Sequence, residues 1–281
     1  MIALGIAAAF GGRDAPRSAP EPQGPAALFA FDTTLQGPGY LPAVKAERTP
    51  AFPARSALRK ARRFVRSRAG IVSFAVVDSR GNTRGMGLDR RFVSASLVKA
   101  PLMVAELRRL GRSSGVDEGT AGLLRAMITY SDNDAADSIY SRSGDAALID
   151  VAQRTGMRRF TVQGHWGNAQ VAAGDLARFM SRFDRVLPRG TRRLAHELLG
   201  AVVEEQRWGI PAAAEPQWGV ELKGGWRSTD LGQLVHQAAV LERGKTEIAI
   251  AVLSDGQPSD AYGRETVRGT AERLLAGSTV R

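Results

Sequence analysis

The spacing of hydrophobic residues predicts four elements in the first part of the chain. Residues 55–68 repeat apolar side chains at helical spacing and carry arginines on the opposite side, which predicts an amphipathic helix. Residues 71–78 and 83–88 are rich in β-branched and aromatic side chains and flank a turn, so they predict two strands. Residues 97–110 have too few polar positions for a surface helix and predict a buried one.

The rest of the chain alternates between a helical block and a group of strands. Its pattern predicts helices over 119–129, 134–140, 146–155, 173–183 and 192–205, strands over 221–226, 233–241 and 247–253, and a helix over 265–275. We therefore expect an α+β fold in which an antiparallel sheet is built from both ends of the chain. The helical block forms a second lobe, and a cleft separates it from the sheet.

The N-terminal residues differ from the rest in composition. Residues 1–10 form an apolar run that is too short to span a bilayer and resembles the core of an export signal without its positive stretch. Eight of the 13 prolines lie between Gly11 and Pro53, which is typical of a linker. We expect residues 1–12 to be the remnant of an export signal, 13–54 a linker and 55–281 the folded domain.

Composition narrows the choice of partners. With 281 residues and 43% hydrophobic content, the chain can bury a full-sized core. The net charge of +11 comes from residues scattered along the chain without a recognition motif, so we expect no nucleic acid, whereas an acidic cell-wall polymer or an anionic surface is compatible. There is no cysteine, and three distant histidines show no metal spacing, so no metal or cofactor is expected. The sequence does not determine the oligomeric state.

Three short motifs carry the chemistry, in the order Ser96-Leu97-Val98-Lys99, Ser131-Asp132-Asn133 and Lys223-Gly224-Gly225. Lysine is scarce, since only five of the 39 basic residues are lysines, yet two of the five lie in these motifs. Arginine cannot give up its proton under biological conditions, whereas a desolvated lysine can. This distribution favours lysines that act as proton acceptors over lysines that merely solvate a surface.

The three motifs resemble the S-x-x-K, S-D-N and K-T-G set of the class A β-lactamase and penicillin-binding superfamily. The resemblance runs from about Ala57 to the C-terminus and implies the β-lactamase/transpeptidase-like fold. It implies that Ser96 is the nucleophile and Lys99 the base for acylation. Ser131 would carry the proton to the leaving nitrogen, and Lys223 would polarise the Ser131 hydroxyl. Asn133 would bind the substrate amide.

The third motif departs from the family pattern. Gly224 lacks the hydroxyl that helps to hold a substrate carboxylate, and Arg227 is a candidate to replace that contact. The resemblance places Gly225 and Trp226 at the substrate strand, where the backbone N–H of Trp226 would complete an oxyanion hole with that of Ser96. Ordinary core packing is an equally good interpretation of the Trp226 side chain.

The family's loop glutamate, which activates the water for deacylation, is missing. No Asp or Glu occurs between Asp150 and Asp175. His165 lies in this stretch and is a candidate base, because imidazole titrates near neutral pH. A surface histidine without a catalytic role is the favoured alternative.

These observations support an exported β-lactamase-like serine hydrolase or acyltransferase. It would form an acyl-enzyme at Ser96 with β-lactams or with D-alanyl peptides or esters of the cell wall, and deacylate slowly. One alternative is a true class A β-lactamase with a substituted deacylation base. Another is an inactive wall-binding module, although such a module has no need of the motif serines and lysines.

Overall fold

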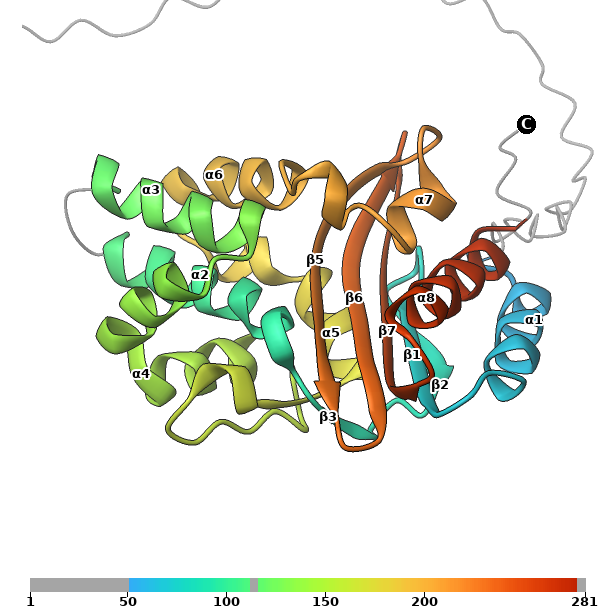
Figure 1. Cartoon of the computed structure of the whole chain (residues 1–281). Coiled ribbons are helices and arrows are strands. Elements are labelled where there is room, and N and C mark those ends of the chain that lie inside the picture. Colours follow the sequence, from blue (N-terminus) through green and yellow to red (C-terminus); the bar gives the residue numbers. More distant parts are fainter. Residues whose placement is uncertain (1–50, 112–115, 277–281) are drawn as a thin grey trace, which may run out of the picture. The chain divides into compact units, whose positions relative to one another are not determined.

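A five-stranded antiparallel sheet lies between two groups of helices (Figure 1). The computed structural model describes residues 51–111 and 116–276. The predicted signal remnant at 1–12 and all but the last residues of the predicted linker at 13–54 lie outside the described residues.

The sheet has the strand order β2-β1-β7-β6-β5. Its strands are β1 (Ile71–Val77), β2 (Thr83–Met86), β5 (Gly219–Thr229), β6 (Gly232–Arg243) and β7 (Thr246–Gln257). Strand β1 pairs with β7, so the two ends of the chain meet at the centre of the sheet. The predicted fold class and the predicted construction of the sheet are confirmed.

Successive side chains of a strand point to opposite faces of the sheet, and both faces are buried here. On β1, Ala75 and Val77 face the core shared with the helical lobe, whereas Phe74 and Val76 face a second core. The second core is covered by α1 (Arg55–Arg66), α8 (Asp260–Leu275) and the short α7 (Ile210–Ala214) (Figure 1). Burial on both faces fixes the register of the strands that carry the site.

The helical lobe surrounds one almost fully buried helix, α2 (Lys99–Leu110). Around it lie α3 (Glu118–Arg125), α4 (Asn133–Thr155), α5 (Ala173–Met180) and α6 (Arg189–Gly200). The two helices predicted over 134–140 and 146–155 are the two halves of α4. A kink separates them where Gly144 adopts φ 66° and ψ −177°. Glycine populates this conformation readily, which explains the break.

Several elements differ from the predictions. A two-stranded sheet joins β3 (Arg91–Val93) to β4 (Gln170–Ala172), and neither strand was predicted because each spans only three residues. The helix predicted over 119–129 ends as α3 and continues as a π-helical turn, Ala126–Tyr130. Both differences lie beside sequence motifs singled out above, since β3 leads to Ser96 and the π turn leads to Ser131.

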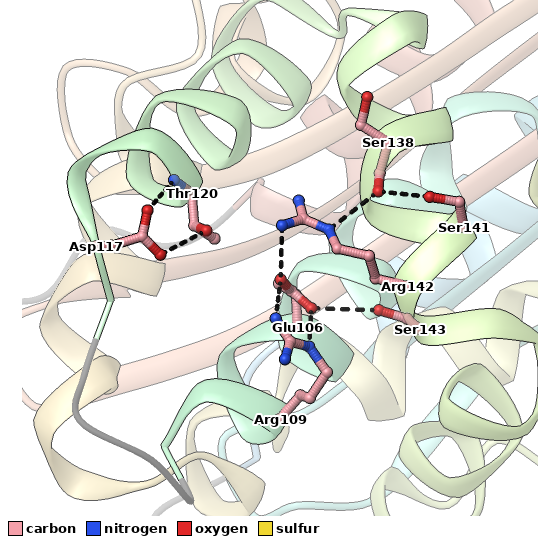
Figure 2. A network of polar contacts seen from close by, with 8 residues as sticks. All are labelled: Glu106, Arg109, Asp117, Thr120, Ser138, Ser141, Arg142 and Ser143. Carbon is pink, nitrogen blue, oxygen red and sulfur yellow. Dashed lines mark hydrogen bonds and ion pairs between the residues drawn. The ribbon is translucent and has the colours of Figure 1, made fainter.

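A buried carboxylate joins α2 to α4 (Figure 2). Glu106 is fully buried, and its two oxygens accept hydrogen bonds from Arg109 at 2.8 Å each. Arg142 approaches the same carboxylate at 3.9 Å, and the hydroxyl of Ser143 donates to it at 3.4 Å. Because both guanidinium groups come from half-exposed side chains, Glu106 alone carries the full cost of desolvation.

Glu106→Gln is expected to lower the free energy of unfolding by about 2–3 kcal/mol, because the amide presents donors to two guanidinium groups in a buried position. Arg154→Gln, which breaks an ion pair on the exposed face of α4 with Asp150, is the matched control and should cost at most about 1 kcal/mol. Urea denaturation of the two variants checks this. Equal losses would show that burial of the Glu106 pair contributes nothing extra.

Candidate functional site

Ser96 lies on a 3-10 turn, Ala95–Val98, between β3 and α2. The buried helix predicted over 97–110 begins two residues later as an α-helix, at Lys99, so Ser96 lies on the turn that precedes it. Ala95, directly before the serine, has a φ of +45°, a region that residues with a Cβ rarely adopt. Such backbone strain is concentrated at functional sites.

Lys99 is fully buried and points at the S-D-N motif. Its Nζ donates to Asn133 Oδ1 at 2.7 Å and to the Ser131 carbonyl at 2.6 Å, and it lies 3.4 Å from Ser131 Oγ. Among the residues that the structure describes, no hydrogen bond joins Ser96 to Lys99. Catalytic hydrogen bonds are often long or poorly aligned before substrate binds, so the missing bond does not exclude proton transfer from Ser96 to Lys99.

The S-D-N motif owes its shape to the elements that it connects. Ser131 ends the π-helical turn in a left-handed conformation, with φ 61° and ψ 33°. Asp132 then caps α4 by accepting a hydrogen bond from the Ala135 amide at 2.7 Å, which is a structural role. Asn133 therefore lies in the first turn of α4, beside the lysine.

Lys223 approaches the same serine from the sheet. It lies on β5, is fully buried, and donates to Ser131 Oγ at 3.0 Å and to the Gly224 carbonyl at 3.1 Å. Ser131 Oγ is thus placed between the amino groups of two buried lysines. The structure brings together four of the predicted site residues: Lys99, Ser131, Asn133 and Lys223.

Burial makes both lysines easier to deprotonate. Desolvation lowers the pKa of Lys99 to about 8, against the opposing charges of Asp132 and Asp137. Desolvation, and then the charge of Lys99, lowers the pKa of Lys223 to about 7. Because the two amino groups interact, their pKa values describe the pair as a whole. The pair loses a proton near neutral pH, and that loss is shared between Lys99 and Lys223.

Gly225 allows β5 to approach the Ser96 turn closely. A Cβ at this position would lie 3.0 Å from the backbone nitrogens of Ser96 and Leu97. The strand partner of Gly225 is His236, which is fully buried and whose ring bonds Val93 O at 3.1 Å and the Ser254 amide at 3.0 Å. Burial lowers the pKa of His236 to about 4, so a neutral imidazole fixes the strands behind the site.

A cavity of about 340 Å³ is lined by Ser96 and Asn133. Trp226 is 37% exposed at its wall, so the core-packing interpretation of this side chain is wrong. Arg227 Nη1 donates to Asn168 Oδ1 across the cavity at 3.4 Å. The cavity thus brings several predicted residues into one space: Ser96, Asn133, His165, Trp226 and Arg227.

His165 is an exposed residue at the edge of this cavity. Its ring stacks on Trp166, and its Nδ1 accepts a hydrogen bond from the Gly167 amide at 3.0 Å. A neutral imidazole has one unprotonated nitrogen, and that nitrogen is already occupied here. In this arrangement His165 has no lone pair left to accept a proton from water.

Asp137 and Trp166 also belong to the site, although the sequence did not predict them. The indole Nε1 of Trp166 donates to Asp137 Oδ1 at 2.6 Å, and Lys99 Nζ lies 4.8 Å from the centre of its ring. Asp137 follows Asn133 by four residues, which is one helical turn and places both on one face. That spacing is visible in the sequence, but the family pattern places the deacylating carboxylate in the loop and not on this helix.

Within residues 51–111 and 116–276, no group of three or more His, Asp or Glu side chains is arranged to hold a metal ion. No helix in that part of the chain is long and apolar enough to cross a membrane.

Comparison with known proteins identifies the family. A model of the beta-lactamase enzyme family matches residues 112–276, more than half of the chain. The chain belongs to the beta-lactamase enzyme family. The match includes the S-D-N and K-G-G motifs, and the structure adds the preceding Ser96–Lys99 segment to the same site. The predicted class, a serine hydrolase of the β-lactamase type, is confirmed.

Solved β-lactamases share the fold of this family member. A β-lactamase from Sphaerobacter thermophilus superposes with a TM-score of 0.68 at 19% identity, covering 80% of this chain and 98% of the other. A class A β-lactamase from Mycobacterium abscessus gives 0.68 at 20%, covering 80% and 100%. A β lactamase from Xanthomonas campestris gives 0.67 at 16%, covering 78% and 96%. No curated protein matches the sequence significantly.

Proposed function

We propose that this β-lactamase family member forms an acyl-enzyme at Ser96 with β-lactams or with D-alanyl peptides or esters of the cell wall. The observation that carries the proposal is the position of Ser131 Oγ between the amino groups of Lys99 and Lys223. Two buried lysines around a hydroxyl, beside a cavity that contains a second serine, form a path for moving one proton.

In the proposed acylation, neutral Lys99 accepts the proton of Ser96 as its oxygen attacks the substrate carbonyl. The backbone N–H groups of Ser96 and Trp226 hold the developing oxyanion. As the C–N bond breaks, Ser131 gives its proton to the leaving nitrogen and recovers one from the lysine pair. Lys223 keeps Ser131 in place for this transfer.

Substrate recognition follows from the cavity wall. Asn133 Oδ1 is used by Lys99, which leaves its Nδ2 donors for the carbonyl of the substrate's side-chain amide. Gly224 offers no hydroxyl to a carboxylate, and we assign that contact to the guanidinium of Arg227. The half-exposed indole of Trp226 supplies an aromatic surface beside it.

We further propose that deacylation is slower than acylation, because residues 151–174 supply no carboxylate to activate water. Action on D-alanyl substrates agrees with this, since a long-lived acyl-enzyme can be transferred to an amine. We propose export through a signal whose remnant is residues 1–12, a linker over 13–54 and a catalytic domain over 55–281. The wall-binding module is not favoured, since burying two lysines is costly in a site without catalysis.

A fluorescent penicillin is expected to label the wild-type protein covalently at a single site and to leave Ser96→Ala unlabelled. Ser138→Ala, which removes an exposed hydroxyl from α4, serves as the matched control and should be labelled like the wild type. Intact-protein mass spectrometry gives the stoichiometry. A full adduct on Ser96→Ala would refute the assignment of the nucleophile, and no adduct on the wild type would refute the proposed function.

A further inference from the structure

The cavity that contains Ser96 also contains one carboxylate, supplied by a helix instead of the loop. Asp137 lines the cavity together with Ser96 and Asn133. It lies on α4 one turn beyond Asn133, and its negative charge acts on Lys99. A carboxylate in this position faces the same space as an acyl group attached to Ser96.

The carboxylate is oriented, but only one of its oxygens is used. Oδ1 accepts the hydrogen bond from the Trp166 indole at 2.6 Å, and Trp166 is itself almost fully buried. In the described residues, no other hydrogen bond or ion pair involves the Asp137 side chain. Oδ2 is therefore available to accept a proton from a water molecule in the cavity.

We propose that Asp137 is the general base that hydrolyses the acyl-enzyme, and that Trp166 is the positioning residue that holds its carboxylate toward the cavity. This rests on the proposed function, since it presupposes an acyl group on Ser96. It assigns to α4 the chemical role that the carboxylate-free loop cannot fill.

The step balances as an ester hydrolysis. Asp137 Oδ2 accepts one proton of the water as the water oxygen bonds to the acyl carbon. The resulting oxyanion is held by the backbone N–H groups that serve acylation. When the intermediate collapses, the bond from the acyl carbon to Ser96 Oγ breaks, Oγ receives the proton from Asp137, and the acid leaves.

The competing base, His165, is less well placed for this step. Its unprotonated nitrogen accepts the Gly167 amide, so it would have to break that bond before it could accept a proton. Asp137 needs no such rearrangement, because its second oxygen has no partner among the described residues.

The charge of Asp137 has a second effect, which separates a catalytic role from a structural one. Its negative charge raises the pKa of Lys99 and so opposes loss of the lysine's proton. Removing that charge should leave acylation at neutral pH unchanged or faster, because more Lys99 is neutral, while deacylation becomes slower. A variant that only disturbed the fold would slow both steps.

The test is Asp137→Asn, which keeps an oxygen that can accept the Trp166 hydrogen bond. Asp134→Asn is the matched control, because it removes the same charge from the first turn of the same helix outside the cavity. Acylation by a chromogenic cephalosporin is followed by stopped flow, and decay of the adduct by intact-protein mass spectrometry. Asp137→Asn should lengthen the life of the adduct about 10²-fold or more without slowing its formation.

One result would overturn the proposal, namely an adduct on Asp137→Asn that decays at the wild-type rate, or no more slowly than on Asp134→Asn. A stalled adduct in His165→Ala in the same experiment would then identify His165 as the base. This result differs from failure of the proposed function, in which the wild-type protein forms no adduct on Ser96.

Discussion

Lys99→Arg is expected to acylate about 10²–10⁴-fold more slowly than the wild type, nearly as slowly as Lys99→Ala. The charge is preserved, but a guanidinium does not release its proton under biological conditions and cannot act as a base. The larger head group must also fit where Lys99 Nζ bonds Ser131 and Asn133 in a fully buried position. Single-turnover acylation by a reporter β-lactam measures the effect.

The wild-type acylation rate should depend on pH in a defined direction. The reactive form of Lys99 is neutral, and the pKa of Lys99 is lowered to about 8 and that of Lys223 to about 7. The rate should therefore rise as the pH is raised through about 7–8 and then level off. Lys60→Arg, an exposed substitution on α1, should show the wild-type profile. Near wild-type acylation by Lys99→Arg would mean that Lys99 acts only as a fixed charge.

The sequence predicted the members of the lysine–serine cluster because their chemistry restricts the choice of residue. Unlike arginine, a buried lysine can give up its proton and act as a base, and the chain uses few lysines, so Lys99 and Lys223 were conspicuous. The contacts around Ser131 were implied by the family resemblance, since residues 99, 131 and 223 are far apart in sequence. The sheet that brings Lys223 to this position was predictable from the short apolar runs of its strands.

Asp137 and Trp166 were missed for a different reason. Their pairing depends on how the loop before β4 folds against α4, and no local pattern encodes that contact. The exposure of Trp226 was likewise undecided, because a tryptophan on a strand fits a core and a cavity wall equally well. Positions with one chemically admissible residue type are readable from sequence, whereas positions defined by packing between distant segments require the fold.

The second large effect expected is a burst in the reaction with a chromogenic cephalosporin. About one equivalent of product should form rapidly as Ser96 is acylated. The steady-state turnover that follows should be at least about 10²-fold slower than this first phase. The loop from Val151 to Gly174 offers no carboxylate, so a step that usually gains about 10²–10⁴ from a general base depends on Asp137 alone. One oxygen of that carboxylate is already bonded to the Trp166 indole, which makes it a weaker acceptor.

Stopped-flow absorbance resolves the two phases, and mass spectrometry of the quenched mixture shows whether the acyl-enzyme accumulates. Linear turnover from the first cycle, with no trapped adduct, would contradict slow deacylation and favour a true class A β-lactamase. The variant in which that turnover disappears would then identify the base. Loss in Asp137→Asn would place the base on α4, and loss in His165→Ala would require His165 to release the Gly167 amide during the reaction.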